Sequence, residues 1–98
     1  MGQMDVALIE RLASKYVWWQ APEEAAKRPE RVIAQVMNIG DFEDAQVLVD
    51  ILGEAALREV LTSAEAGQFN GRSWFYWHYR LGLAGLDEVP PLPTRRFG

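Results

Sequence analysis

The stretch Ser73-Trp-Phe-Tyr-Trp-His-Tyr-Arg-Leu-Gly-Leu83 holds five of the eleven aromatic residues of this chain and its single histidine. Read as a helix, the stretch has two unlike faces. One face carries an i, i+3, i+4, i+7 series: Trp74, Trp77, His78 and Leu81. Tyr76 and Arg80 lie one turn apart on the opposite face. The spacing predicts a helix that begins at an Asn70 or Ser73 cap, ends near Gly82, and buries its first face.

Composition restricts the class of protein. Ninety-eight residues correspond to one domain, and the absence of cysteine excludes disulfides and thiolate chemistry. The N-terminal sequence lacks the pattern of a signal peptide, and no apolar run approaches the roughly 18 residues that cross a bilayer. We therefore expect a cytoplasmic protein. A formal charge of −4 argues mildly against broad binding to phosphate backbones.

The rest of the chain also has helical periodicity. Apolar spacing predicts helices over 5–17, 22–28, 30–38, 42–52 and 54–65. Asp5 and Asp41 can cap the helices that follow them, and Gly40 suits a left-handed C-cap. The helix over 42–52 is apolar almost all round, so we expect it at the centre of the bundle with the aromatic helix packed against it. The fold class predicted is all-α, with five or six short helices.

Two features of the N-terminal half permit more than one interpretation. Trp18 and Trp19 follow the first helix, and we expect them to end it as a hydrophobic anchor against the core. The alternative is a platform on which a ligand stacks. Lys27, Arg28 and Arg31 form a small basic cluster, which is either a solvated corner or a contact for phosphate or an acidic partner.

No pattern typical of a metal, cofactor or catalytic site is present. One histidine without cysteine leaves only carboxylates as further metal ligands, and none lies four residues from His78. His78 also has no Ser or Cys partner at readable spacing, so we interpret it as a buried, hydrogen-bonded histidine. No glycine-rich phosphate loop occurs. We expect no cofactor and no enzymatic activity.

Residues 31–52 have the form helix, short turn, helix, which is also the form of some DNA-binding motifs. Charge argues against that interpretation, because no Lys or Arg lies between Arg31 and Arg58. This interval instead contains five acidic residues: Asp41, Glu43, Asp44, Asp50 and Glu54. A DNA contact would have to use other arginines, namely Arg28, Arg72, Arg80, Arg95 and Arg96.

The chain changes character after a helical domain over 1–86. Residues 87–98 form a Pro- and Arg-containing tail, which we expect to be extended because its prolines exclude a helix. Within it, Val89-Pro-Pro-Leu-Pro-Thr-Arg95 fits the Φ-P-x-Φ-P-x-R pattern of ligands for SH3-type grooves. The tail either lies across its own domain, with Leu92 and Phe97 as small anchors, or serves as a handle for another protein.

Several segments together resemble a family of small prokaryotic proteins. The resemblance rests on Trp18-Trp19, Arg31-Val-Ile-Ala-Gln-Val-Met-Asn-Ile-Gly-Asp41, Ser73–Leu81, Pro90-Pro-Leu-Pro93 and Arg95-Arg-Phe97. Genes of that family often lie beside nucleotidyltransferase toxins of the AbiEii type. The resemblance implies an antitoxin-like or regulatory companion and not the transferase itself.

The leading expectation is a non-enzymatic protein-binding module that blocks its partner sterically. The candidate partner-binding residues are amphipathic side chains of the aromatic helix and the tail: Tyr76, Tyr79, Arg80, Leu92, Arg95 and Phe97. The acidic stretch from Asp41 to Glu54 could meet a basic cleft on the partner. Alternatives are a nucleic-acid-binding transcriptional regulator, a small-ligand site between Trp18, Trp74 and His78, and a homodimer formed through the aromatic face.

Overall fold

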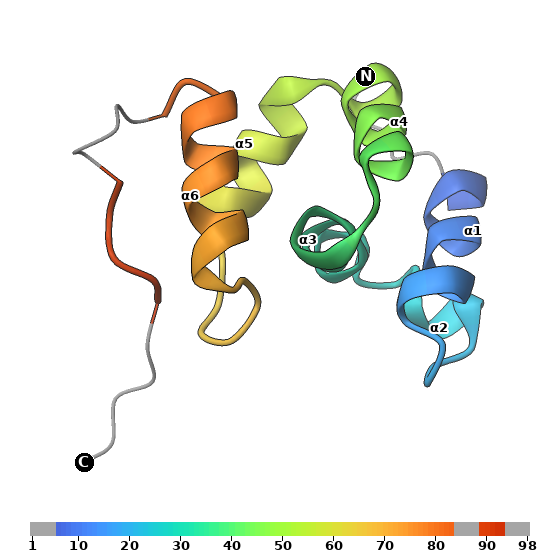
Figure 1. The fold of residues 1–98 in the computed structure, drawn as a ribbon. Coiled ribbons are helices and arrows are strands. Elements are labelled where there is room, and N and C mark those ends of the chain that lie inside the picture. Colours follow the sequence, from blue (N-terminus) through green and yellow to red (C-terminus); the bar gives the residue numbers. More distant parts are fainter. Residues whose placement is uncertain (1–5, 84–88, 94–98) are drawn as a thin grey trace, which may run out of the picture.

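The computed structural model describes residues 6–83 and 89–93, and within them it is helical without strands. The helices are α1 (Val6–Tyr16), α2 (Pro22–Ala25), α3 (Pro29–Ile39), α4 (Phe42–Leu52), α5 (Glu54–Thr62) and α6 (Gly71–Arg80). Figure 1 shows α3 in the middle of the bundle, with α1 and α2 on one side and α5 and α6 on the other. None of these helices is long and apolar enough to cross a bilayer. The all-α prediction is confirmed for these residues.

Helix α3 is the centre of the bundle, because it packs against each of the other five helices. Its buried side chains are Val32, Ile33, Ala34, Val36 and Met37. The prediction that 42–52 forms the central helix is wrong. Helix α4 packs mainly against α3 and α5 and buries only Ala45 and Leu48, while Phe42 is 70% exposed. The apolar composition of a helix indicates how much surface it could bury. How much it does bury depends on which other helices pack against it.

Side-chain caps define the starts of two helices. The Oδ1 atom of Asp41 accepts a hydrogen bond from the backbone N–H of Asp44 over 2.9 Å and caps α4. Asn70 caps α6 in the same way, accepting from the N–H of Ser73 over 2.8 Å. Of the two caps considered for the aromatic helix, Asn70 is therefore the one used, and the helix begins at Gly71. The proposed Asp5 cap of α1 lies outside the described residues.

Gly40 is needed for space and not for a left-handed conformation. Its backbone is extended (φ −68°, ψ 155°), so the predicted left-handed C-cap is wrong. A Cβ atom at this position would overlap the carbonyl oxygen of Val36 and lie 2.8 Å from the Val36 Cγ1 atom. The N–H of Gly40 donates to that same carbonyl oxygen over 2.7 Å. The chain therefore leaves α3 through a close backbone approach that only glycine permits.

Helices α2 and α5 end earlier than predicted, whereas α3 extends one residue beyond its predicted range of 30–38 at each end. Helix α2 stops at Ala25 instead of residue 28, and α5 stops at Thr62 instead of 65. Helix α6 ends at Arg80, and Gly82 lies just beyond it with a positive φ of 70°, which confirms the predicted end of this helix. The last turns of helices fray readily, so apolar spacing alone does not fix the residue at which a helix ends.

Helix α6 buries the predicted face against different neighbours from those expected. Trp74, Trp77, His78 and Leu81 are all buried, which confirms the helical assignment of that face. The helices that cover the face are α3 and α5, so the predicted packing against 42–52 is wrong. Polar contacts explain the choice, because side chains of α6 satisfy the C-terminal carbonyls of α3. The Ser73 hydroxyl donates to the Asn38 carbonyl over 2.7 Å, and the Trp77 indole N–H donates to the Met37 carbonyl.

Candidate functional site

A groove lies between α6 and the start of α4, over the C-terminal end of α3. Its volume is about 420 Å³. The lining residues are Met37, Asn38, Gly40, Asp41, Phe42, Ala45, Arg72, Ser73, Tyr76 and Trp77. Two of the lining rings are open to solvent, since Phe42 is 70% and Tyr76 is 46% exposed. Arg72 is exposed and makes no ion pair within the described part of the chain. We call this feature the α4–α6 groove.

The guanidinium of Arg80 is held in place beside the rings of α6. Its Nη1 atom donates to the Tyr76 hydroxyl over 2.9 Å, and its Nη2 atom donates to Gln46 Oε1 over 3.0 Å. The guanidinium carbon also lies 5.1 Å from the centroid of the Trp77 ring. These contacts join α6 to α4 and fix the orientation of a cation at the surface. A partner that binds there meets a side chain whose conformational entropy is already reduced.

The structure brings together only some of the predicted partner-binding residues. Tyr76 and Arg80 are hydrogen-bonded neighbours, and Tyr79 is exposed on the same helix. Leu92 is half-buried and packs against the core. Arg95 and Phe97 lie outside the described residues, as does the predicted domain boundary between 86 and 87.

The prediction that His78 is a buried, hydrogen-bonded histidine is confirmed. It is buried, and its Nδ1–H donates to the carbonyl oxygen of Trp74 over 2.8 Å, because a carbonyl can only accept. Its ring lies edge-on to the Trp74 ring, with 4.3 Å between centroids. The proposed small-ligand site between Trp18 and these two residues is not assembled, because α1, which Trp18 follows, lies across α3 from α6 (Figure 1).

Trp18 and Trp19 are surface residues. The prediction that they anchor the end of the first helix against the core is wrong, since they are 74% and 58% exposed. Helix α1 ends at Tyr16, and Val17 is the last buried residue before the turn. The N–H of Gln20 donates to the Val17 carbonyl over 3.1 Å, closing a turn that directs both indoles outward. The two rings contact each other edge to face at 5.5 Å.

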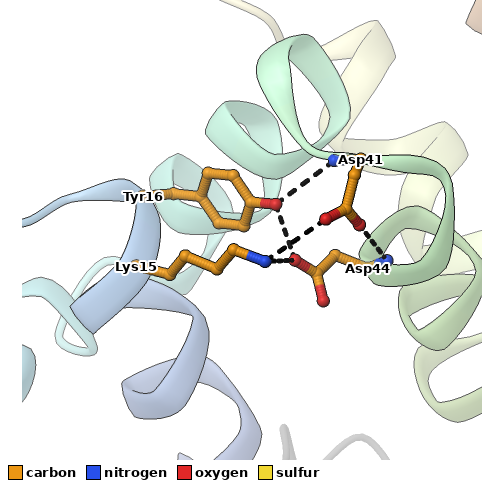
Figure 2. A network of polar contacts seen from close by, with 4 residues as sticks. All are labelled: Lys15, Tyr16, Asp41 and Asp44. Atoms are coloured by element: carbon orange, nitrogen blue, oxygen red, sulfur yellow. Dashed lines mark hydrogen bonds and ion pairs between the residues drawn. The ribbon is translucent and has the colours of Figure 1, made fainter.

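A polar network links α1 to the turn between α3 and α4 (Figure 2). The Lys15 Nζ atom lies 2.7 Å from Asp44 Oδ2 and 3.3 Å from Asp41 Oδ2. The Tyr16 hydroxyl donates to Asp44 Oδ2 over 2.6 Å and accepts from the backbone N–H of Asp41 over 3.2 Å. Two of the acidic side chains expected to face a basic partner are therefore neutralised internally.

The network shifts the titration of its members. The hydrogen bond from Lys15, and to a smaller extent the one from Tyr16, holds the pKa of Asp44 below its usual value. The same contacts with Asp44 and Asp41 raise the pKa of Lys15. Burial, followed by the hydrogen bond to Asp44, raises the pKa of the Tyr16 phenol. The group therefore acts as a structural cross-link that is strongest when the carboxylates are ionised and Lys15 is protonated.

Phe42 and Arg72 were absent from the predicted site. Phe42 was assigned to a central helix, and its role at the surface follows only from the peripheral position of α4. Arg72 stood out in sequence only as one of several arginines that could contact nucleic acid. The sequence held no signal for Phe42, because its place at the groove depends on how α3 orients α4.

Within residues 6–83 and 89–93, no group of three or more His, Asp or Glu side chains is arranged to hold a metal ion. Comparison with protein-family models, with curated proteins and with solved structures finds no match to this chain. The resemblance to companions of AbiEii-type toxins therefore stays a prediction.

Proposed function

We propose that this chain is a non-enzymatic protein-binding module that meets its partner through the α4–α6 groove and the adjacent Arg80. The observation that supports this most directly is the exposure of the Phe42 and Tyr76 rings on an apolar groove. Aromatic side chains and arginine are enriched at the energetic centres of protein interfaces. A partner that fits would insert an apolar side chain between the rings and place carboxylates on Arg72 and Arg80.

The class of partner follows from the sequence resemblance. We propose an AbiEii-type nucleotidyltransferase toxin, blocked sterically as an antitoxin-like companion would block it. Arg95 and Phe97 of the Pro-rich tail belong to the proposal as further contacts, because both residue types recur at interfaces. The acidic stretch contributes less than its sequence suggests, since Asp41, Asp44 and Glu54 already pair with Lys15 and Arg58.

Binding to a purified nucleotidyltransferase toxin of this type, measured by calorimetry, tests the proposal. We expect a 1:1 complex that Phe42→Glu and Arg80→Ala each weaken at least tenfold. Ile51→Glu is the matched control, because Ile51 is 52% exposed on the same helix but does not line the groove. Absence of a complex, or equal weakening by the control, would contradict the proposal.

A second candidate function is nucleic-acid binding, favoured by the exposed Trp18–Trp19 pair. Successive bases stack on such rings. Trp19 also lines a hollow of about 370 Å³ together with Arg31. A gel shift with single-stranded and promoter DNA at two salt concentrations tests this function. Binding that weakens steeply with salt and disappears in Trp18→Ala/Trp19→Ala supports it, and no shift at low salt counts against it.

A further inference from the structure

The segment 89–93, Val89-Pro-Pro-Leu-Pro93, runs back along α6 (Figure 1). The indole Nε1–H of Trp74 donates to the carbonyl oxygen of Pro90 over 2.6 Å. Val89 and Leu92 are half-buried and pack against the hydrophobic core, whereas Pro90 and Pro91 are exposed. The segment is therefore held by one hydrogen bond and two apolar side chains.

This pattern of contacts matches the periodicity of a polyproline II helix. That helix has three residues per turn, so Val89 and Leu92 lie on one face. Its carbonyl groups form no internal hydrogen bonds and are free to accept one from a partner. Domains that recognise such helices use aromatic grooves, and Trp74 packs here against Phe69, with 5.8 Å between ring centroids, and against His78.

We propose that the Trp74 side of α6 is a binding site for polyproline II peptides of the form Φ-P-x-Φ-P, and that the chain's own residues 89–93 occupy it. A separate peptide with that pattern replaces them in trans. The site is distinct from the α4–α6 groove, because Trp74 does not line that groove. It therefore stands independently of the proposed function.

Occupancy by a segment of the same chain sets how strongly a separate peptide can compete. Because the segment and its site belong to one chain and are close in sequence, the effective concentration of the segment is on the order of 1 mM. One hydrogen bond and two half-buried side chains give modest affinity, so the segment and a peptide in excess exchange. Opening the segment is then expected to raise the apparent affinity for an added peptide about tenfold or more.

The test uses the full-length chain with Val89→Asp and Leu92→Asp, which remove the two apolar contacts. A dye-labelled peptide with the sequence of residues 88–95 is titrated and followed by fluorescence anisotropy. We expect binding to this variant at least about tenfold tighter than to the wild-type chain. Adding Trp74→Phe should weaken binding roughly fivefold, because the ring is kept and the hydrogen-bond donor is lost.

Trp19→Phe in the same background is the matched control and should leave peptide binding unchanged, because Trp19 is exposed outside this site. A peptide with both apolar residues replaced by Asp should not bind. If the Asp variant does not fold, Val89→Ser and Leu92→Ser, which remove the two apolar contacts without adding charge, replace it. No peptide binding to a folded open variant, or no effect of Trp74→Phe, would overturn the proposal.

Discussion

The indole N–H of Trp77 donates to the carbonyl oxygen of Met37 over 2.7 Å and so joins α6 to the last turn of α3. Carbonyls in the last turn of a helix lack an amide donor four residues later. In a continued helix the backbone N–H of Asp41 would donate to the Met37 carbonyl. Here it donates to the Tyr16 hydroxyl instead. One aromatic side chain therefore fills the core, caps α3 and positions the wall of the α4–α6 groove.

Substitution of Trp77 should separate its two roles. Trp77→Ala creates a cavity in the core, and we expect the free energy of unfolding to fall by about 3–5 kcal/mol. Trp77→Phe keeps most of the ring volume but leaves the Met37 carbonyl without its donor, so a loss of about 1–3 kcal/mol is expected. Urea denaturation measures both values. Equal stability of Trp77→Ala and the wild type would refute the core assignment.

Replacement of Trp18 or Trp19 by alanine should have little effect on stability. Both indoles are mostly exposed, and surface substitutions of this kind usually change the free energy of unfolding by less than about 0.5 kcal/mol. Thermal melts of the two variants beside Trp77→Ala provide the comparison. A loss above about 2 kcal/mol in either would show that the pair packs against the domain after all.

The Tyr16 hydroxyl should stabilise the fold through the turn between α3 and α4. Tyr16→Phe removes the bond to Asp44 and leaves the Asp41 amide without its acceptor. We expect a loss of about 1–2 kcal/mol in urea denaturation, with the groove-lining Phe42 repositioned. Tyr79→Phe is the control, because Tyr79 is exposed. Equal effects of the two substitutions would contradict the role of the network.

Stability should decrease at both ends of the pH range. The folded-state pKa of Asp44 is lowered, so its contribution is present above the ordinary value of 3.8 and is lost as pH falls through the folded value. The pKa values of Lys15 and Tyr16 are raised above 10.5 and 10.0, so their contributions are present below these values and are lost as pH rises through the folded values.

Urea midpoints measured across pH test this expectation, with a plateau between about pH 5 and pH 9. Asp44→Asn should lower the plateau and flatten the decrease on the acid side. Asp50→Asn is the matched control, since Asp50 lies on the same helix and accepts only from Gln46 in the described contacts. If stability falls with pH on the acid side in the same way in the two variants, Asp44 is not the group responsible for the acid dependence.

Local patterns predicted the helices well, because they depend on neighbours in sequence. The stripe of α1, from Leu8 to Tyr16, is buried as its spacing indicated, and Asp41 and Asn70 cap the helices that follow them. The pair Tyr76–Arg80 was also correctly placed on the exposed side of α6. Each of these features spans at most a few turns, over which helical geometry alone determines which side chains meet.

The candidate site was only half predicted. Tyr76 and Arg80 could be named because they lie off the buried face of a single helix. Phe42, Arg72 and Gln46 could not, because their relation to α6 depends on how α3 orients α4. The Trp18–Trp19 pair shows the same limit, since the hydrophobicity of the indoles did not indicate that the turn after Val17 directs them outward.

The sequence by itself determined that the chain is helical, where most of its helices begin, and which face of the aromatic helix is buried. Only the tertiary structure decided that α3 and not α4 is the centre, and that α6 packs on α3 and α5. The physical reason is that periodicity measures the capacity of a helix to bury apolar surface, which is a local property. The choice of neighbours depends on long-range contacts, such as the Trp77–Met37 hydrogen bond, that satisfy polar groups far apart in the chain.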